Sequence, residues 1–241
     1  MDAKTYLEKG AELFLPHTSV DMVIMGYQDH QLKVLLQQMA TKWTLPGGGV
    51  GKEESVTDAA TRVLYERVGL SNQFLKLFTV FGNGDRSFRD EFEQIFKAVD
   101  MAWNPDLWIN NRHITICFYA LVDIQKTEPT GGNLDLPVAW HPMTALPDMW
   151  FDHSAITLAG LEQVRKDVSS EYVSHNLLPE EFSMPELHRL HETILAKKLE
   201  RSRFQKKMLA LDLFERLPKM KEDAPRRKPF LYRIKNKDKS R

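Results

Sequence analysis

Apolar positions along this chain gather in short runs separated by polar turns, a pattern typical of β-strands. The runs at 18–27 and 32–39 predict two strands, with Asp29, His30 and Gln31 as the turn between them. Later runs predict strands at 74–81, 114–122 and 138–141. Helices are expected at 89–100, 154–168 and 202–214, together with one that starts near Ser183. The chain therefore mixes strands and helices.

The stretch 47–70 is the segment around which the rest of the chain is organised. A run of three glycines opens into an amphipathic helix, and glycine lets the backbone approach a ligand closely. Ser55 is expected to cap the helix N-terminus with Asp58 as its capping-box partner, and Gly69 to end the helix. The pattern predicts a ligand-binding loop followed by a helix.

The spacing of residues in this stretch resembles the Nudix box, a loop–helix motif that binds Mg²⁺ and cleaves diphosphates linked to another group. The matching residues are Gly48, Glu54, Arg62, Leu64, Glu66, Gly69 and Leu70. In the family pattern an Arg-Glu pair is followed, two residues later, by Glu-Glu. Here Val63 follows Arg62 and Arg67 follows Glu66, so two of the expected carboxylates are missing.

These two replacements predict that the box no longer catalyses. Positions 63, 66 and 67 share one helix face, where carboxylates of an active enzyme would meet Mg²⁺ bridged to the substrate phosphates. Val63 offers no oxygen, and Arg67 places a fixed positive charge there. We therefore expect no catalytic residue, no cofactor and no metal. The vestigial box comprises Gly48, Glu54, Arg62, Val63, Glu66, Arg67 and Gly69.

Alternatives remain open at this site. A weak Mg²⁺ site at Glu53, Glu54 and Glu66 would support a Nudix hydrolase that acts on a nucleoside diphosphate derivative. An ion pair between Glu54 and Arg62 that holds the loop on the helix is favoured over a catalytic role for either residue.

An insertion at 85–111 separates two of the predicted strands. Its helix is predicted from the recurrence of Phe88, Phe92, Ile95, Phe96 and Val99, and Trp103 and Trp108 follow on a loop. The insertion could be a lid, part of a dimer interface or a packed surface segment. Further along, Asp152 and His153 could form an acid–base pair, but capping of the following helix is favoured.

The C-terminal region has the layout of a helix–turn–helix followed by a basic hairpin. Ser183 and Glu186 predict a capped first helix, whose buried stripe is Leu187, Leu190 and Ile194. In the second helix Phe204, Met208 and Leu211 are expected to face inward. Runs at 214–217 and 230–234 predict the ribbon of a wing. The expected DNA contacts are Arg201, Ser202, Arg203, Lys206, Lys207, Arg226, Arg227 and Lys228.

The charge distribution supports a nucleic-acid partner. The 241-residue chain has 33 basic and 33 acidic residues, but 17 basic and only 6 acidic ones lie in 197–241, which leaves 16 and 27 for the rest. A basic module on an acidic body most often binds nucleic acid. The single cysteine, Cys117, excludes a disulfide framework. The sequence shows no secretory signal and no apolar run long enough for a membrane span, so we expect a cytoplasmic protein.

As a whole the chain resembles the Nudix-related transcriptional regulators, which include repressors of NAD synthesis and of arabinose utilisation. The resemblance rests on the altered box, on the segment 140–153 and on the basic tail. It implies an α/β fold: a Nudix-like α/β/α sandwich with a mixed sheet at 1–168, a linker at 169–181 and a winged helix–turn–helix at 182–241.

The same resemblance implies a homodimer on double-stranded operator DNA, acting as a repressor controlled by a small effector in the Nudix cleft. The expected ligand-binding residues are Gly47, Gly48, Gly49, Glu66, Arg67, Trp103 and Trp108. The effector is a sugar derivative or an ADP-ribose-like nucleotide. The loss of the metal site favours the sugar slightly.

Overall fold

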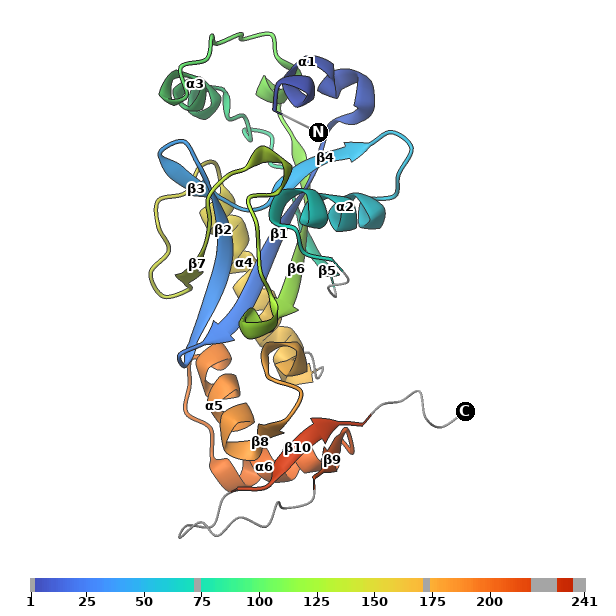
Figure 1. Cartoon of the computed structure of the whole chain (residues 1–241), viewed down its shortest axis with the longest axis vertical. Coiled ribbons are helices and arrows are strands. Elements are labelled where there is room, and N and C mark those ends of the chain that lie inside the picture. Colours follow the sequence, from blue (N-terminus) through green and yellow to red (C-terminus); the bar gives the residue numbers. More distant parts are fainter. Residues whose placement is uncertain (1–2, 72–74, 171–173, 218–228, 236–241) are drawn as a thin grey trace.

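The computed structural model describes residues 3–71, 75–170, 174–217 and 229–235 (Figure 1). A sheet with helices on both faces forms the upper part, and a smaller module of helices and short strands lies below it. The strands of the upper part are β1 (Phe14–Gln28), β2 (Gln31–Met39), β3 (Lys42–Thr44), β4 (Gly47–Gly51), β5 (Leu75–Phe81), β6 (Ile114–Val122) and β7 (Val138–Pro142).

Within the described residues these strands form one mixed sheet in the order β3-β2-β1-β6-β5, with β4 also paired to β1 and β7 to β2. The pair β1–β6 is parallel, with Val20 opposite Ile116, whereas β1 and β2 are antiparallel around the turn after Gln28. Residues 20–26 of β1 are all buried because both faces of the sheet are covered. The predicted strands are confirmed within the described residues, outside which residue 74 lies, but β1 begins at Phe14 and not at residue 18.

Helices cover the two faces of the sheet, as the Nudix resemblance implies. The helices of this part are α1 (Ala3–Leu13), α2 (Val56–Val68), α3 (Arg89–Ala98) and α4 (His153–Ser170), with 3₁₀ turns η1 (Trp108–Asn110), η2 (Ile124–Lys126) and η3 (Gly132–Leu134). Apolar residues of α2 pack on Met22 and Ile24 of β1. On the opposite face α4 packs on Val23 and Met25, and Gly160 allows it to approach Val23 closely.

The insertion contains the predicted helix, α3, which ends at Ala98. Ile95 and Phe96 are buried, as the apolar spacing predicts. Val99, the last residue of the pattern that predicts the helix, is 47% exposed and lies one residue beyond its end. α1 lies at the N-terminus, where the sequence pattern predicts no element; it runs directly into β1.

The C-terminal module contains η4 (Ser174–Leu177), β8 (Phe182–Ser183), α5 (Met184–Leu195), α6 (Arg201–Ala210), β9 (Phe214–Arg216) and β10 (Leu231–Ile234). The strands pair in the order β8-β10-β9, which gives the predicted ribbon a third strand. Ser183 and Glu186 form the predicted capping box of α5. The helix α6 ends earlier than expected, and Leu211 is 42% exposed, so its inward assignment is wrong.

The module shares one apolar cluster with α4 and with the face of the sheet that α4 covers. Leu187, Leu190 and Ile194 of α5 are buried as predicted, together with Phe204 and Met208 of α6. Arg165 of α4 donates from Nε to the backbone oxygen of Ile194 at 2.8 Å, which ties α4 to the last turn of α5. The predicted linker, 169–181, contains the turn η4.

In the parts of the chain that the structure describes, no helix is both long and apolar enough to cross a membrane.

Candidate functional site

The altered box is held together by Arg62, which bonds to two carboxylates and to the glycine run. This run, still called the glycine loop below, is the strand β4 paired with β1, so its prediction as a loop is wrong. Its guanidinium donates to Glu54 Oε2 at 2.9 Å and Oε1 at 2.6 Å, and to Glu66 Oε2 at 2.9 Å. A further bond at 2.9 Å goes to the backbone oxygen of Gly49. Glu54 Oε1 also accepts from Gly51 N at 2.6 Å. The Glu54–Arg62 pair therefore attaches the loop to α2, as the sequence predicts.

These hydrogen bonds shift the pKa values of Glu54 and Arg62. Hydrogen bonding by Arg62 lowers the pKa of Glu54 below its usual value, so this carboxylate is ionised at neutral pH. The same partner, Glu54, raises the pKa of Arg62. Arg62 and Glu66 are each about 30% exposed on their side chains, so the network lies partly open to solvent.

The face formed by positions 63, 66 and 67 is present as predicted. Val63 is 1% exposed, and its side chain packs on Gly48, where a Cβ would come within 3.0 Å. Arg67 is half-buried; its Nε donates to the backbone oxygen of Gly47 at 2.9 Å. Burial lowers the pKa of Arg67 from its very high ordinary value. One guanidinium thus sits beside the glycine loop on the face where an active box carries a carboxylate.

The carboxylates that remain do not fit a magnesium site. Glu53 is exposed on the loop, whereas Glu54 and Glu66 already accept bonds from Arg62. Mg²⁺ requires several oxygen ligands in octahedral geometry, and Arg67 adds positive charge at the same place. Among the described residues, no three acidic, histidine or cysteine side chains are grouped so that they could hold a metal ion.

A cleft with about 250 Å³ of empty space, part of it open to solvent, lies against this face. It is lined by Tyr6, Phe14, Gly48, Gly49, Arg62, Val63, Glu66, Arg67 and Asn133. The fold therefore brings together the predicted ligand residues Gly48, Gly49, Glu66 and Arg67. Gly47 lies next to these residues, and its backbone oxygen accepts a hydrogen bond from Arg67.

Three lining residues come from segments that sequence reasoning missed. Tyr6 lies in α1, Phe14 at the start of β1 and Asn133 in η3. The only signal available in the sequence was the aromatic character of Tyr6 and Phe14. Nothing in their spacing relates them to the box.

The two tryptophans predicted as ligand contacts lie elsewhere. Trp103 packs edge-on against Phe96 of α3, with ring centroids 5.3 Å apart. Trp108 packs behind the cleft against Tyr6 and Phe14, at centroid distances of 5.1 and 5.9 Å. Neither is among the described residues that line the cleft, so the structure does not place them in direct reach of a ligand there.

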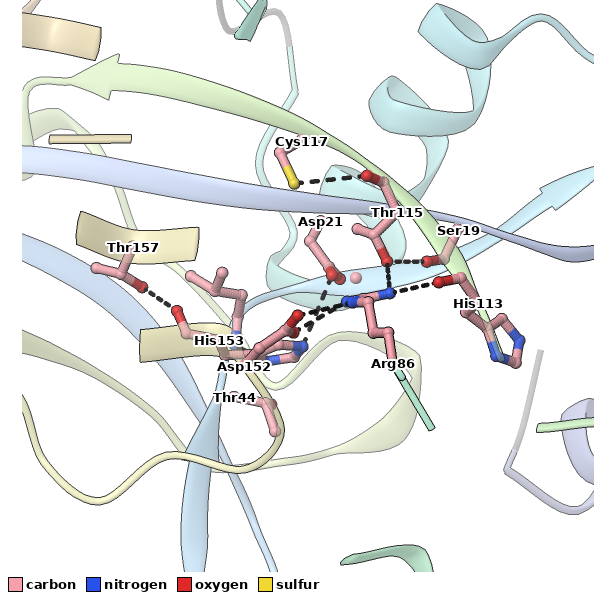
Figure 2. Close-up of polar contacts among 12 residues, drawn as sticks. Ser19, Asp21, Thr44, Arg86, His113, Thr115, Cys117, Asp152, His153 and Thr157 are labelled. Carbon is pink, nitrogen blue, oxygen red and sulfur yellow. Dashed lines mark hydrogen bonds and ion pairs between the residues drawn. The ribbon is translucent and has the colours of Figure 1, made fainter. Parts of the chain in front are cut away.

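A second polar cluster, shown in Figure 2, lies behind the glycine loop. Arg86, from the insertion, forms a two-pronged ion pair with Asp152 at 2.7 and 3.0 Å. The same guanidinium donates to Thr115 Oγ1 at 2.7 Å and to the backbone oxygen of His113 at 2.9 Å. Arg86 is only 7% exposed and Asp152 is partly exposed; their ion pair fastens the insertion to the start of α4.

Asp21 and His153 complete this cluster. His153 Nδ1 accepts from the backbone N–H of Leu45 at 3.0 Å, and its Nε2 lies 3.6 Å from Asp21 Oδ2. Burial raises the pKa of Asp21 and lowers that of His153. Asp152 and His153 therefore bind different partners. They are not an acid–base pair, and the Asp152 carboxylate serves Arg86, so the favoured capping role is wrong for this side chain.

Cys117, which points toward the same region in Figure 2, is buried, and burial raises the pKa of its thiol. A buried thiol with a raised pKa is unreactive. The sequence interpretation of a small apolar core residue therefore agrees with the structure.

The predicted DNA-contact residues of α6 lie together on its outer face. Arg201, Ser202, Arg203, Lys206 and Lys207 are all exposed, whereas Phe204 and Met208 are buried. The carboxylate of Glu200 caps the helix and accepts from the backbone N–H groups of residues 202 and 203. The remaining predicted contacts, Arg226, Arg227 and Lys228, lie outside the described residues.

Comparison with known proteins finds a matching family for each of the two parts of the chain. The NUDIX domain family matches residues 15–159, and the NrtR DNA-binding winged helix domain matches residues 174–234. A similar curated protein is the ADPR responsive transcriptional repressor NtrR of Acinetobacter baylyi. It is 25% identical over 231 residues, which are 92% of this chain and 84% of that protein.

Solved structures share the whole architecture. Shewanella oneidensis NrtR in complex with a 27mer DNA superposes with a TM-score of 0.67 at 24% identity, over 90% of this chain and 93% of that chain. A MutT/nudix family protein from Enterococcus faecalis has a TM-score of 0.68 at 21% identity, over 92% of this chain and 87% of that chain. The chain therefore belongs to the Nudix family, as a transcriptional regulator that joins a Nudix effector domain to a DNA-binding winged helix.

Proposed function

We propose that this protein is a repressor whose Nudix domain binds a nucleoside diphosphate sugar of the ADP-ribose type without hydrolysing it. The observation that carries the proposal is the arrangement of α2. Arg67 faces the cleft at a position where an active box has a carboxylate, and Arg62 bonds to both Glu54 and Glu66. A diphosphate can therefore meet a fixed guanidinium in place of a divalent cation.

The class of effector follows from charge. A neutral sugar gains little from a guanidinium beside a glycine loop, whereas a diphosphate accepts charge-assisted bonds from both. The curated relative from Acinetobacter baylyi, described as ADPR responsive, supports the same choice. We therefore replace the slight preference for a sugar effector with a preference for the nucleotide.

Hydrolysis is disfavoured by the same residues. Nudix-type cleavage uses metal-bound phosphates, and the described carboxylates of the box are held by Arg62 or lie exposed on the loop. The proposal is metal-free binding that alters DNA affinity. The rival function is a hydrolase with a rearranged metal site.

On DNA, the exposed basic residues of α6 enter or flank the major groove. We propose that the protein binds a palindromic operator as a homodimer. Coupling between the two parts requires the effector to bind the DNA-bound and free arrangements unequally, which typically gives about a 5–150-fold change in affinity.

Fluorescence anisotropy tests this proposal with a duplex taken from the protein's own promoter region. In EDTA, ADP-ribose is expected to change the DNA affinity at least about fivefold, whereas arabinose leaves it unchanged. Arg67→Ala should abolish the response, and Lys97→Ala on exposed α3 is the matched control. Turnover of ADP-ribose with Mg²⁺ or Mn²⁺ above about 1 s⁻¹ would instead support the hydrolase.

A further inference from the structure

Tyr6 lies inside the cleft although it belongs to a helix outside the box. It lines the cleft together with Gly49 and Arg67, and the Arg67 guanidinium carbon lies 5.7 Å from the centroid of its ring. A guanidinium over an aromatic face at this distance is a favourable cation–π contact. Burial raises the pKa of Tyr6, so its hydroxyl is neutral at physiological pH. The Tyr6 ring is therefore a partner of Arg67, beside the bond of Arg67 to the Gly47 oxygen.

The space left in the cleft is too small for the effector class proposed above. Sites for small ligands have volumes of about 300–1,000 Å³ and enclose most of the ligand. The figure of about 250 Å³ for the cleft includes space open to solvent, so the part that encloses a ligand is smaller still. A nucleoside diphosphate sugar carries a base, two pentoses and two phosphates. One wall of the cleft must therefore move before such a ligand can be enclosed.

Three of the walls are built into the core and cannot move easily. Val63 of α2 is 1% exposed, β4 is paired along β1, and the segment that leads into η3 is joined to the end of α2 by a bond from Thr130 N to Val68 O at 3.0 Å. Displacing any of them would break apolar packing, the strand ladder or that bond. These walls form the fixed part of the site.

The fourth wall, α1, is held differently. It precedes β1, and Figure 1 shows it at the end of the sheet away from the C-terminal module. Its anchor is Trp108, whose Nε1 donates to the backbone oxygen of Tyr6 at 3.1 Å. Gly10 lies against the same indole, so closely that a Cβ would come 2.4 Å from it. Aromatic packing and the bond from Trp108 to Tyr6 thus hold α1 to the insertion, and at its last residue the backbone oxygen of Leu13 accepts from Lys52 N at 3.1 Å.

We propose that Tyr6 is a specificity-determining residue of the effector site: its ring occupies the place beside Arg67 that a phosphate of the effector takes, and α1 moves outward when that phosphate binds. The inference rests on the proposed function. A phosphate offers Arg67 a full negative charge and displaces the ring, whereas a neutral sugar offers nothing comparable. The cleft therefore opens for anionic ligands and stays closed to neutral ones.

Isothermal titration with ADP-ribose and inorganic pyrophosphate, in EDTA, measures the effect of removing the ring. Tyr6→Ala should bind both ligands about tenfold more tightly than wild type, because no ring has to be expelled. Tyr6→Phe keeps the ring and should stay within about threefold of wild type. Tyr65→Ala, which removes an exposed tyrosine from α2, is the control for an unrelated loss of an aromatic ring.

Hydrogen exchange on the full chain supplies a second readout. Amides of residues 3–13 should exchange faster in wild type with saturating ADP-ribose than without it, while those of α2 are protected. Thermal unfolding of Tyr6→Ala checks that the variant remains folded, and the wild-type exchange result does not depend on that variant.

The outcomes separate the two proposals. If wild type binds ADP-ribose but Tyr6→Ala binds it more weakly, or if exchange in 3–13 slows with ligand, Tyr6 is a direct ligand contact and the displacement is wrong. If wild type binds neither ADP-ribose nor pyrophosphate, the proposed function fails and the role of Tyr6 falls with it. Tighter binding by Tyr6→Ala together with faster exchange in α1 supports the inference.

Discussion

The carboxylate of Asp21 lies where a side chain on residue 47 would have to be: a Cβ on Gly47 would come 1.8 Å from Asp21 Oδ1. The two residues are paired across β1 and β4, and each belongs to a different polar network. Gly47 holds Arg67 of the cleft, whereas Asp21 faces His153 at the start of α4. The first glycine of the loop is therefore the point at which the effector cleft meets the buried cluster of Figure 2.

Gly47→Ala should destabilise the protein by about 1–3 kcal/mol, the usual cost of overpacking a filled site. The added methyl group must push Asp21 away from His153 or shift the loop that holds Arg67. Urea unfolding of both variants measures the change. Gly84→Ala is the control because a Cβ there meets nothing within 4 Å, and its cost should stay within about 0.5 kcal/mol. Equal effects of the two substitutions would contradict the contact.

The double variant Val63→Glu, Arg67→Glu restores the family pattern and should bind Mg²⁺ about tenfold more tightly than wild type. Both positions line the cleft, so the new carboxylates join Glu66 on one face. Without the ion, Val63→Glu should cost about 2–4 kcal/mol, because residue 63 is buried against Gly48. Isothermal titration and thermal unfolding measure both effects.

Tyr65→Glu is the control for this pair, since it adds a carboxylate to the exposed side of the same helix. It should alter neither Mg²⁺ affinity nor stability noticeably. If the double variant gains no Mg²⁺ affinity, the assignment of positions 63, 66 and 67 to the metal face is incorrect.

Arg203→Ala and Lys206→Ala should each weaken binding to the operator duplex and reduce the slope of log affinity against log salt by about 1. Both side chains are exposed on the outer face of α6, so they can neutralise phosphates without changing the buried side of the helix. Anisotropy titrations between about 50 and 200 mM salt provide the slopes. Lys97→Ala removes an exposed cation from α3, and an equal loss there would show that net charge alone is responsible.

Stability should fall as pH decreases from about 6.5 to about 4 because of His191. Burial lowers the pKa of this residue to about 4, with smaller contributions from Lys207 and His188. In this interval the unfolded chain therefore binds a proton that the folded chain excludes. The contribution of neutral His191 to the free energy of unfolding is complete only above pH about 6.5. Between about pH 7.5 and 5 the expected loss is about 2 kcal/mol.

His191→Gln tests this assignment, because glutamine does not titrate and its amide oxygen can replace the ring nitrogen that contacts Ser174 Oγ at 2.9 Å. Urea unfolding at both pH values gives the difference between wild type and variant, in which other titrating groups cancel. A variant with the same pH dependence as wild type would assign the loss to other groups.

Much of the box could be predicted because its contacts are local. Glu54, Arg62 and Glu66 lie within 13 residues, and helical spacing alone brings the last two together at i and i+4. The capping box at Ser183 and the buried stripe of α5 are equally local, since one helix face determines both. Leu211 was misplaced because it lies just beyond the observed end of α6, where the helical spacing no longer applies.

The sequence by itself determined the altered box, the strands, the basic second helix and the division of charge, because these depend on residue type and short-range spacing. Only the tertiary structure decided that Tyr6 and Asn133 share a cleft with Arg67, and that Arg86 pairs with Asp152 across 66 residues. Such contacts depend on where the sheet brings distant segments together. Contacts between residues so far apart in the sequence leave no repeating pattern of residue types, so the sequence alone does not predict them.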